Sequence, residues 1–230
     1  MRSKFGYGSK GKADTVFELR PLLQKPENLG GSMEASKLND IKGELETVLL
    51  KDLPSCILLA MARENLLRSL LPELVNCIGF DQHSPRHHLD VFEHTLAVVD
   101  GTPPDLLVRW AALLHDIGKP FCFSQDEDGV GHFYGHDRKS ADMAVDILGR
   151  LGYPEEFVRR VCSLVYYHMT RIFFHTERPV RKVTQKLGED DAERLMILFN
   201  ADLRAHAPEN SIEEPVLFEV IYRRLQVNEL

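Results

Sequence analysis

Near the middle of this 230-residue chain lies the segment Ala111-Ala112-Leu113-Leu114-His115-Asp116-Ile117-Gly118-Lys119-Pro120. It ends an apolar run with an imidazole and a carboxylate on adjacent residues, and these two kinds of side chain bind divalent metal ions together. The alternative interpretation is a helix terminus, because a histidine favours the negative end of the helix dipole. The segment makes a metal site the first hypothesis.

Four further residues of metal-binding type lie in or beside segments with helical periodicity, namely His94, His136, His168 and Asp202. Apolar residues recur at helical spacing around His94, before His115, and over about 137–151, 155–168 and 191–205. Facing helices of a bundle can project such ligands into one interior site. Taken alone, His94 is typical of an ordinary helix histidine, and Asp202 of a surface carboxylate near a helix end.

The rest of the chain predicts one domain with a loosely attached start. Residues 1–35 contain several glycines and lysines with little periodicity, which predicts a flexible N-terminal arm. Residues 36–230 are then a single helical domain. The turn Asp126-Glu127-Asp128-Gly129 joins two short extended pieces, which predicts a β-hairpin. The expected fold class is all-α, a helical bundle with one short β-hairpin.

Composition and charge exclude several classes of protein. The formal net charge of -7 argues against a general nucleic-acid binder, DNA included, although it leaves open a local basic groove. No apolar run approaches the ~18 residues of a membrane span, and the start of the chain lacks the apolar core of a signal peptide. The four cysteines are scattered among apolar neighbours, which predicts reduced core residues in a cytoplasmic protein without a membrane partner.

Five short motifs carry a resemblance to a known family: Leu70-Leu71-Pro72-Glu73-Leu74, Asp90-Val91-Phe92-Glu93-His94-Thr95, Leu113-Leu114-His115-Asp116-Ile117-Gly118-Lys119-Pro120, Asp126-Glu127-Asp128-Gly129 and His132-Phe133-Tyr134-Gly135-His136. They resemble the HD-domain metal-dependent phosphohydrolase superfamily. They are most similar to the HD domain that follows the catalytic head in bacterial tRNA nucleotidyltransferases of the CCA-adding and poly(A) polymerase type. The resemblance covers about residues 50–206 and implies an HD-domain helical bundle with a divalent-metal site.

The resemblance implies a minimal set of four metal ligands: His94, His115, Asp116 and Asp202. Members that hold two metals add two histidines and use the aspartate of the pair as a bridge, so Asp116 is also expected to act in catalysis. For His136 and His168 two interpretations stay open, as ligands of a second ion or as cavity residues that hydrogen-bond phosphate or water. One or two ions of Mn, Fe, Co, Ni, Zn or Mg are expected, because mixed imidazole and carboxylate ligation accepts several metals.

Three cations are candidates for binding a phosphate. Lys119 follows Asp116 closely and can reach a metal-bound phosphate, which would make it catalytic, whereas the alternative is a solvated loop lysine. Arg138 and Arg171 can clamp a second phosphate, because a guanidinium binds phosphate in a bidentate manner. Asp90 lies four residues before His94 and is either a further ligand or a partner that orients the imidazole. The remaining histidines are predicted to be loop or surface residues: His83, His87, His88, His132, His175 and His206.

Together these inferences predict a metal-dependent phosphohydrolase in which activated water attacks phosphorus of a nucleotide or of a cyclic phosphodiester. The partner is then a small phosphorylated substrate, with an RNA 3′ end as a further candidate. Two other classes stay open: a non-catalytic HD-fold module that binds a nucleotide, an RNA end or a partner protein, and a di-iron oxygenase. Nucleotide addition is not expected. The catalytic head of the nucleotidyltransferases has a Gly-Ser loop and an Asp-x-Asp pair; Gly30-Gly31-Ser32 is only weakly similar to that loop, and no Asp-x-Asp pair follows it at a suitable distance.

Overall fold

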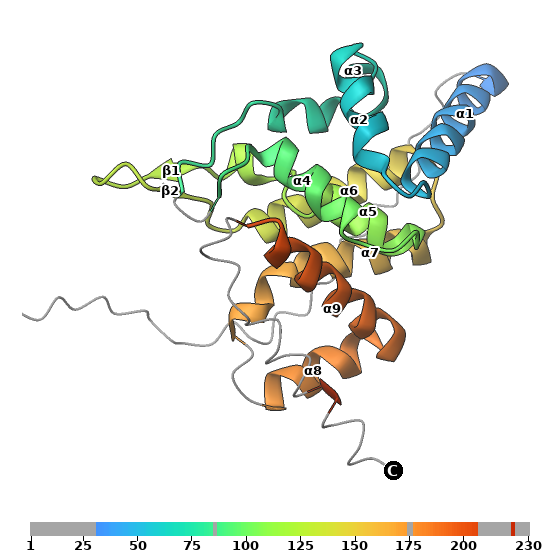
Figure 1. The fold of residues 1–230 in the computed structure, drawn as a ribbon. Coiled ribbons are helices and arrows are strands. Elements are labelled where there is room, and N and C mark those ends of the chain that lie inside the picture. The colour runs from blue at the N-terminus through green and yellow to red at the C-terminus, as the bar shows by residue number, and fades with distance from the viewer. Residues whose placement is uncertain (1–30, 85–86, 174–176, 207–221, 224–230) are drawn as a thin grey trace, which may run out of the picture.

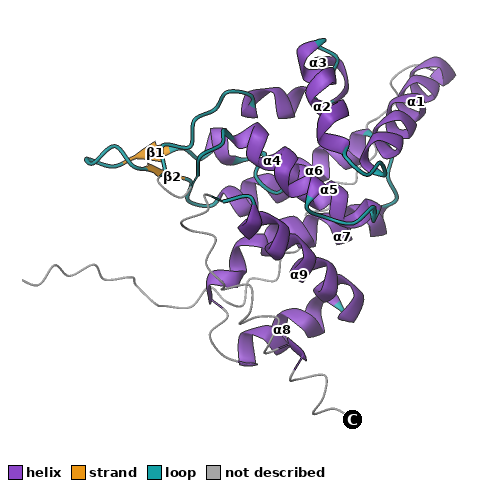
Figure 2. Ribbon diagram, in the orientation of Figure 1, coloured by secondary structure: helices purple, strands orange, loops and turns teal. Residues whose placement is uncertain are grey.

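The computed structural model describes residues 31–84, 87–173, 177–206 and 222–223, and the side chains of 31–38 and 171–173 lie outside this description. Within these ranges the chain is a bundle of helices with one small two-stranded sheet, so the all-α prediction is confirmed (Figures 1 and 2). The α-helices are α1 (Gly31–Leu49), α2 (Pro54–Arg63), α3 (Leu67–Leu70), α4 (Val91–Asp100), α5 (Leu106–Leu114), α6 (His136–Arg150), α7 (Glu155–Tyr167), α8 (Glu177–Leu187) and α9 (Glu189–Arg204). Short 3₁₀ helices are η1 (Pro72–Cys77), η2 (Lys119–Phe121) and η3 (His168–Phe173).

Helix α5 lies in the core of the bundle. Its residues from Leu107 to Leu114 are all buried, and it packs against α4, α7 and α9. A helix that is apolar on every side is stable only where neighbouring elements cover all of its faces. The residues that directly follow α5, His115 and Asp116, therefore leave the helix inside the protein and are buried as well.

Local signals determine where the helices around the core begin. Asp90 caps α4 in a capping box, in which its Oδ1 accepts from the Glu93 N–H at 2.7 Å and Glu93 Oε2 accepts from the Asp90 N–H at 3.3 Å. Asp105 caps α5 by accepting from two N–H groups of the first turn. Gly135 precedes α6 with a φ of 78°, a conformation that glycine adopts at little cost.

The backbone after α5 packs directly against the first turns of α6. The Gly118 N–H donates to Ser140 Oγ at 2.9 Å. A Cβ atom on Gly118 would lie 2.8 Å from the Ser140 nitrogen and 3.0 Å from the His136 oxygen, so this close approach requires glycine. The contact fixes the segment that carries His115 and Asp116 against the start of α6, where His136 lies.

The predicted hairpin is confirmed. Strands β1 (Ser124–Gln125) and β2 (Gly131–His132) pair antiparallel, with Ser124 opposite His132. In Figures 1 and 2 the hairpin projects from the side of the helical bundle.

The observed elements correct two expectations. Helix α1 begins at Gly31, so residues 31–35 belong to a helix, which suits the helix formers Met33, Glu34 and Ala35; residues 1–30 of the predicted arm lie outside the described residues. Cys56 is exposed, because α2 turns the face that contains Leu58 toward the core, and Cys122 is only partly buried, whereas Cys77 and Cys162 are buried as predicted. In the described residues, none of the helices combines the length and apolar character required to cross a bilayer.

Candidate metal centre

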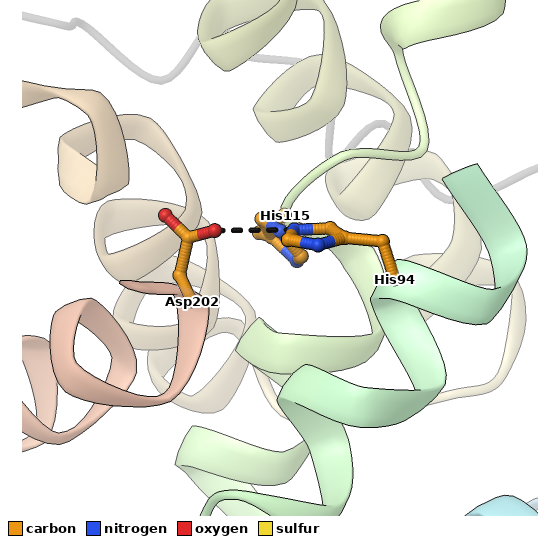
Figure 3. A group of neighbouring side chains, drawn as sticks. All are labelled: His94, His115 and Asp202. Carbon is orange, nitrogen blue, oxygen red and sulfur yellow. Dashed lines mark hydrogen bonds and ion pairs between the residues drawn. The ribbon is translucent and has the colours of Figure 1, made fainter. Parts of the chain in front are cut away.

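Six buried residues from different parts of the chain converge in one place. Each is at most 6% exposed, and they come from α4, the end of α5, the start of α6, the end of α7 and the last turns of α9. Figure 3 shows three of them pointing toward one another from their separate helices. All six are candidate ligands named from the sequence: His94, His115, Asp116, His136, His168 and Asp202.

The six residues form two groups of three whose ligand atoms lie within 4.8 Å of one another. The first triad consists of His94, His115 and Asp202, in which His94 Nε2 lies 3.1 Å from Asp202 Oδ1 (Figure 3). The second triad consists of Asp116, His136 and His168. Each triad supplies both imidazole nitrogen and carboxylate oxygen, the donor set of mixed-ligand metal sites.

The carboxylate of Asp116 lies between the first triad and the two histidines of its own triad. Its Oδ2 faces the first triad, 3.2 Å from His115 Nε2 and 3.6 Å from His94 Nε2. Its Oδ1 faces the second triad, 3.2 Å from His136 Nε2 and 3.6 Å from His168 Nε2. One carboxylate thus presents a different oxygen to each group, which is the arrangement needed to bridge two cations.

Backbone carbonyl groups orient three of the imidazoles. Each Nδ1 hydrogen-bonds the carbonyl oxygen three residues earlier in the chain, at 2.8 Å for His115, 2.7 Å for His136 and 2.6 Å for His168. Because a carbonyl oxygen can only accept, Nδ1 carries the proton and the lone pair of the neutral ring lies on Nε2. The three Nε2 atoms point inward, so these rings are held in the form that binds a metal ion.

Two observations show that the donor atoms suit a metal ion. Nε2 of His136 lies 3.2 Å from Nε2 of His168, although both atoms carry lone pairs in the oriented neutral rings. Two nitrogens bound to one tetrahedral ion at ~2.0–2.1 Å lie roughly 3.3–3.4 Å apart, so a cation between them accounts for this distance. His115 Nε2 is buried and has no hydrogen-bond partner, as expected for a ligand atom.

The electrostatics of the centre favour a charged Asp116 and an uncharged His168, whereas at His115 burial lowers the pKa but the Asp116 carboxylate outweighs burial and raises it. Burial alone raises the pKa of Asp116, but the neighbouring His115, Lys119 and His136 outweigh burial and hold the pKa well below its usual range. Burial lowers the pKa of His168, and the neighbouring histidines His136 and His115 lower it further. Asp116 is therefore ionised and His168 uncharged near neutral pH, which are the forms that bind metal.

A comparison with protein families shows the family of the segment that contains this centre. The HD domain model matches residues 86–205, which contain both triads. The chain belongs to the HD domain family. The resemblance found in the sequence is confirmed, and His115 and Asp116 are hereafter called the HD pair. HD domains bind divalent metals, and the two triads are where this chain can hold them.

The curated relatives carry names from tRNA metabolism. The chain is 39% identical over 168 residues to the A-adding tRNA nucleotidyltransferase of Deinococcus radiodurans, which covers 68% of this chain and 38% of that protein. It is 38% identical over 138 residues to the CC-adding tRNA nucleotidyltransferase of Thermus thermophilus, which covers 57% of this chain and 32% of that protein. A multifunctional CCA protein of Aromatoleum aromaticum is 35% identical, with 71% of this chain and 40% of that protein covered. The chain thus spans well under half the length of these relatives.

Lys119 is buried beside the HD pair. Its Nζ lies 2.6 Å from Asp116 Oδ2 and donates to Gln82 Oε1 at 2.7 Å. The alternative of a solvated loop lysine is wrong, because the side chain is 5% exposed. Gln82 is itself buried and donates to the Leu89 carbonyl oxygen at 3.1 Å. No periodicity or motif in the sequence marks Gln82, so its part in this contact could not be predicted.

The two arginine candidates are not part of the assembled centre. Arg138 is exposed on α6, and the ion pairs found among the described residues do not join it to either triad. Arg171 lies in η3 after His168, and its side chain lies outside the described residues. Contacts of both arginines with a substrate stay predictions.

Asp90 is neither a metal ligand nor the partner that orients His94. Its carboxylate caps α4 and also accepts from the Gly79 N–H at 2.8 Å. The orienting partner of His94 is the Ala205 carbonyl oxygen, 3.4 Å from Nδ1. Asp90 therefore positions His94 indirectly, by fixing the start of the helix that carries it.

Two histidines that were predicted to be loop or surface residues lie against the first triad. The ring of His206 is 5.4 Å from that of His94, and its Nδ1 donates to the Asp202 carbonyl oxygen at 2.7 Å. The ring of His87 is 4.4 Å from that of His206 and 5.1 Å from that of His94. Burial, followed by the charge of Lys119, lowers the pKa of His87 to about 2, so this ring is neutral. The one sequence signal was the short distance between His87 and the His94 helix.

Proposed function

We propose that this chain is a metal-dependent phosphohydrolase that uses one or two divalent ions to hydrolyse a phosphomonoester or phosphodiester. The observation that carries the proposal is the carboxylate of Asp116, which presents one oxygen to each of two buried triads. When bound, such ions lower the pKa of a water molecule and neutralise charge on the phosphoryl oxygens.

The residues of the chain have separable parts in this reaction. The two triads hold the ions and exclude bulk water, because all their members are buried. The carbonyl groups behind His115, His136 and His168 keep each Nε2 pointing inward. The ammonium of Lys119 places a positive charge beside Asp116, where an N–H of that group can also contact a phosphoryl oxygen.

The proposed substrates are nucleotides, cyclic nucleotides and phosphorylated RNA 3′ ends. The names of the relatives, which are tRNA nucleotidyltransferases and CCA proteins, support a substrate of this kind. Mn, Fe, Co, Ni and Zn all suit mixed nitrogen and oxygen ligands, whereas Mg prefers oxygen ligands throughout. The cytoplasm is the proposed location, since enzymes that act on tRNA work there.

The test measures inorganic phosphate released from nucleoside monophosphates and the ring-opened 2′- or 3′-monophosphate formed from 2′,3′-cyclic nucleotides, with Mn, Mg, Co, Ni and Zn added in turn. Wild type is expected to turn over at least one substrate in a metal-dependent manner. Asp116→Asn is expected to lower turnover at least ~100-fold, because the bridging oxygen loses its charge. Asp142→Asn, an exposed carboxylate change on α6, is the matched control and is expected to behave as wild type.

The same experiment separates the two alternatives. A folded protein that hydrolyses neither monophosphates nor cyclic nucleotides with any ion, yet binds nucleotide, would contradict hydrolysis and support the non-catalytic module. A protein that binds iron and consumes oxygen without hydrolysing either kind of substrate would contradict hydrolysis and support the oxygenase.

A further inference from the structure

Three aromatic rings form a cluster at the base of the hairpin. Phe80, Phe123 and Phe133 pack edge to face or tilted, with ring centroids 5.6 Å apart for Phe80 and Phe123, 6.5 Å for Phe80 and Phe133, and 5.6 Å for Phe123 and Phe133. We call these three residues the aromatic cluster. Phe123 is its outermost member, with 36% of its surface exposed.

Exposed aromatic rings gather in this part of the molecule. Among the large apolar side chains that the described residues expose, those remote from the hairpin are aliphatic, as Leu53 and Leu66 are. The aromatic ones are Phe121, Phe123 and Tyr134, and all three lie in the segment between the metal ligands Asp116 and His136.

The aromatic cluster adjoins the metal centre through Phe133. The Phe133 ring lies 6.4 Å from the ring of His136, and its carbonyl oxygen accepts from His136 Nδ1 at 2.7 Å. Lys119 Nζ lies 5.3 Å from the centroid of the Phe133 ring and 2.6 Å from Asp116 Oδ2. A ligand whose phosphate lies at the metal centre can therefore reach the cluster with its adjoining part.

The position of the cluster is fixed by a tight contact between the hairpin and the loop before α4. The Gly131 N–H donates to the His83 carbonyl oxygen at 2.7 Å. A Cβ on Gly131 would lie 2.2 Å from the Gln82 oxygen and 3.1 Å from the Phe123 ring. His83 adopts a φ of 47°, the left-handed region that is unfavourable for a residue other than glycine. The rings are thus held in place before any ligand arrives.

We propose that the aromatic cluster is a base-binding subsite, in which an unpaired nucleobase stacks on Phe123 while the phosphate of the same nucleotide lies at the metal centre. The position of the phosphate rests on the proposed function. Aromatic rings bind bases through their π faces without requiring a particular base sequence, and exposed rings beside a cation are typical of such platforms. The proposal places nucleotides and unpaired RNA ends, rather than base-free phosphate esters, among the substrates.

The first test compares adenosine 2′,3′-cyclic phosphate with methyl riboside 2′,3′-cyclic phosphate, which lacks the base. Phe123→Ala and Phe123→Leu are expected to raise KM about 10-fold for the adenosine compound and to leave KM for the base-free compound unchanged. Phe123→Trp keeps a stacking ring and is expected to retain the wild-type KM. Leu66→Ala, another exposed apolar residue but at the junction of α2 and α3, is the control and is expected to change neither value.

A second readout does not depend on turnover. Trp110, the one tryptophan of the chain, is fully buried, so a Phe123→Trp variant adds an exposed indole whose fluorescence can be excited selectively over that of tyrosine. Adenosine monophosphate is expected to quench its fluorescence in the metal-loaded protein, and ribose 5-phosphate is not. Equal responses to both compounds, or an equal rise in KM for both cyclic phosphates in Phe123→Ala, would overturn the subsite. If wild type hydrolyses neither compound yet the quenching is base-dependent, the proposed hydrolysis fails and the subsite stands.

Discussion

Asp191 ties together helices that carry metal ligands, and its replacement by asparagine gives a measurable prediction. The carboxylate lies in the first turn of α9 and is 5% exposed. It accepts two hydrogen bonds from Arg160 on α7, at 2.6 Å and 2.8 Å, and one from Arg194 at 3.1 Å. Arg194 also donates to Asp105 at 2.8 Å, and Asp105 caps α5. The network therefore joins α5, α7 and α9.

The expected cost of Asp191→Asn follows from the burial of the three partners. Removal of one member of a buried ion pair costs ~3–5 kcal/mol, because the other charge stays buried without compensation. The side chains of Arg160 and Arg194 are 28% and 23% exposed, so water recovers part of that loss. We expect a loss of about 2–3 kcal/mol in the free energy of unfolding at pH 7, which for a chain of this size lowers Tm by roughly 5–10 °C.

The pH dependence of the stability difference between wild type and Asp191→Asn provides a second, independent test. Burial raises the pKa of Asp191, but the hydrogen bonds and charges of Arg160 and Arg194 outweigh it and lower the pKa from its ordinary value of 3.8. The carboxylate thus stabilises the fold fully above that value, and this stabilisation is lost as the pH falls through the lower pKa of the folded state. The difference in stability between wild type and Asp191→Asn is expected to be constant from neutral pH to about pH 5 and to shrink below about pH 4.

The assay is urea denaturation and thermal melting of both proteins over this pH range. Glu156→Gln is the control. The side chain of Glu156 is 65% exposed in its pair with Arg159, so the substitution is expected to leave Tm unchanged. Equal stability of Asp191→Asn and wild type at pH 7, or a difference that grows below pH 4, would refute the reasoning.

Three further changes test the packing and the metal. Gly118→Ala is expected to lower the free energy of unfolding in urea by ~1–3 kcal/mol, since its Cβ would meet Ser140. Gly149→Ala, in open space on α6, is the control and is expected to be neutral or stabilising. A Gly149→Ala variant less stable than Gly118→Ala would contradict the close approach. Tyr153→Phe is expected to cost ~1–3 kcal/mol, because the buried Trp110 N–H donates to the Tyr153 hydroxyl at 2.9 Å, and an unchanged Tm would contradict this. Chelation is expected to lower Tm, and added Mn is expected to restore it, because an ion at 100 times its Kd adds ~2.7 kcal/mol to the free energy of unfolding. A Tm that does not respond to the chelator would argue against bound metal.

The convergence of the six candidate ligands could be predicted because each lies at a recognisable place in or beside a periodic segment. The family resemblance implied His94, His115 and Asp202 as ligands and Asp116 as a bridge, and the structure brings these residues together. Helix ends were harder to predict, but α6, α7 and α9 begin and end within two residues of the expected positions. Apolar periodicity is thus sufficient to place helices that pack on a common core.

The contacts around the ligands could not be predicted, because they join residues far apart in the chain through irregular segments. Lys119 meets Gln82, 37 residues earlier, in a loop without periodicity. His87 and His206 meet only after α4 and α9 have packed. Asp90 shows the opposite case: it was predicted as a ligand or as an orienting partner of His94, although the spacing of Asp90 and Glu93 is that of the capping box that the structure shows.

The metal content of gently purified protein tests the central claim most directly, when wild type is compared with a variant in which His136 and His168 are both alanine. The account predicts close to two ions per chain in wild type and close to one in the double variant, because the first triad of His94, His115 and Asp202 remains intact. A wild-type protein that binds no ion would contradict the proposed metal centre, and a wild type that binds only one ion, or a double variant that keeps the wild-type content, would contradict a bridged pair of ions at Asp116.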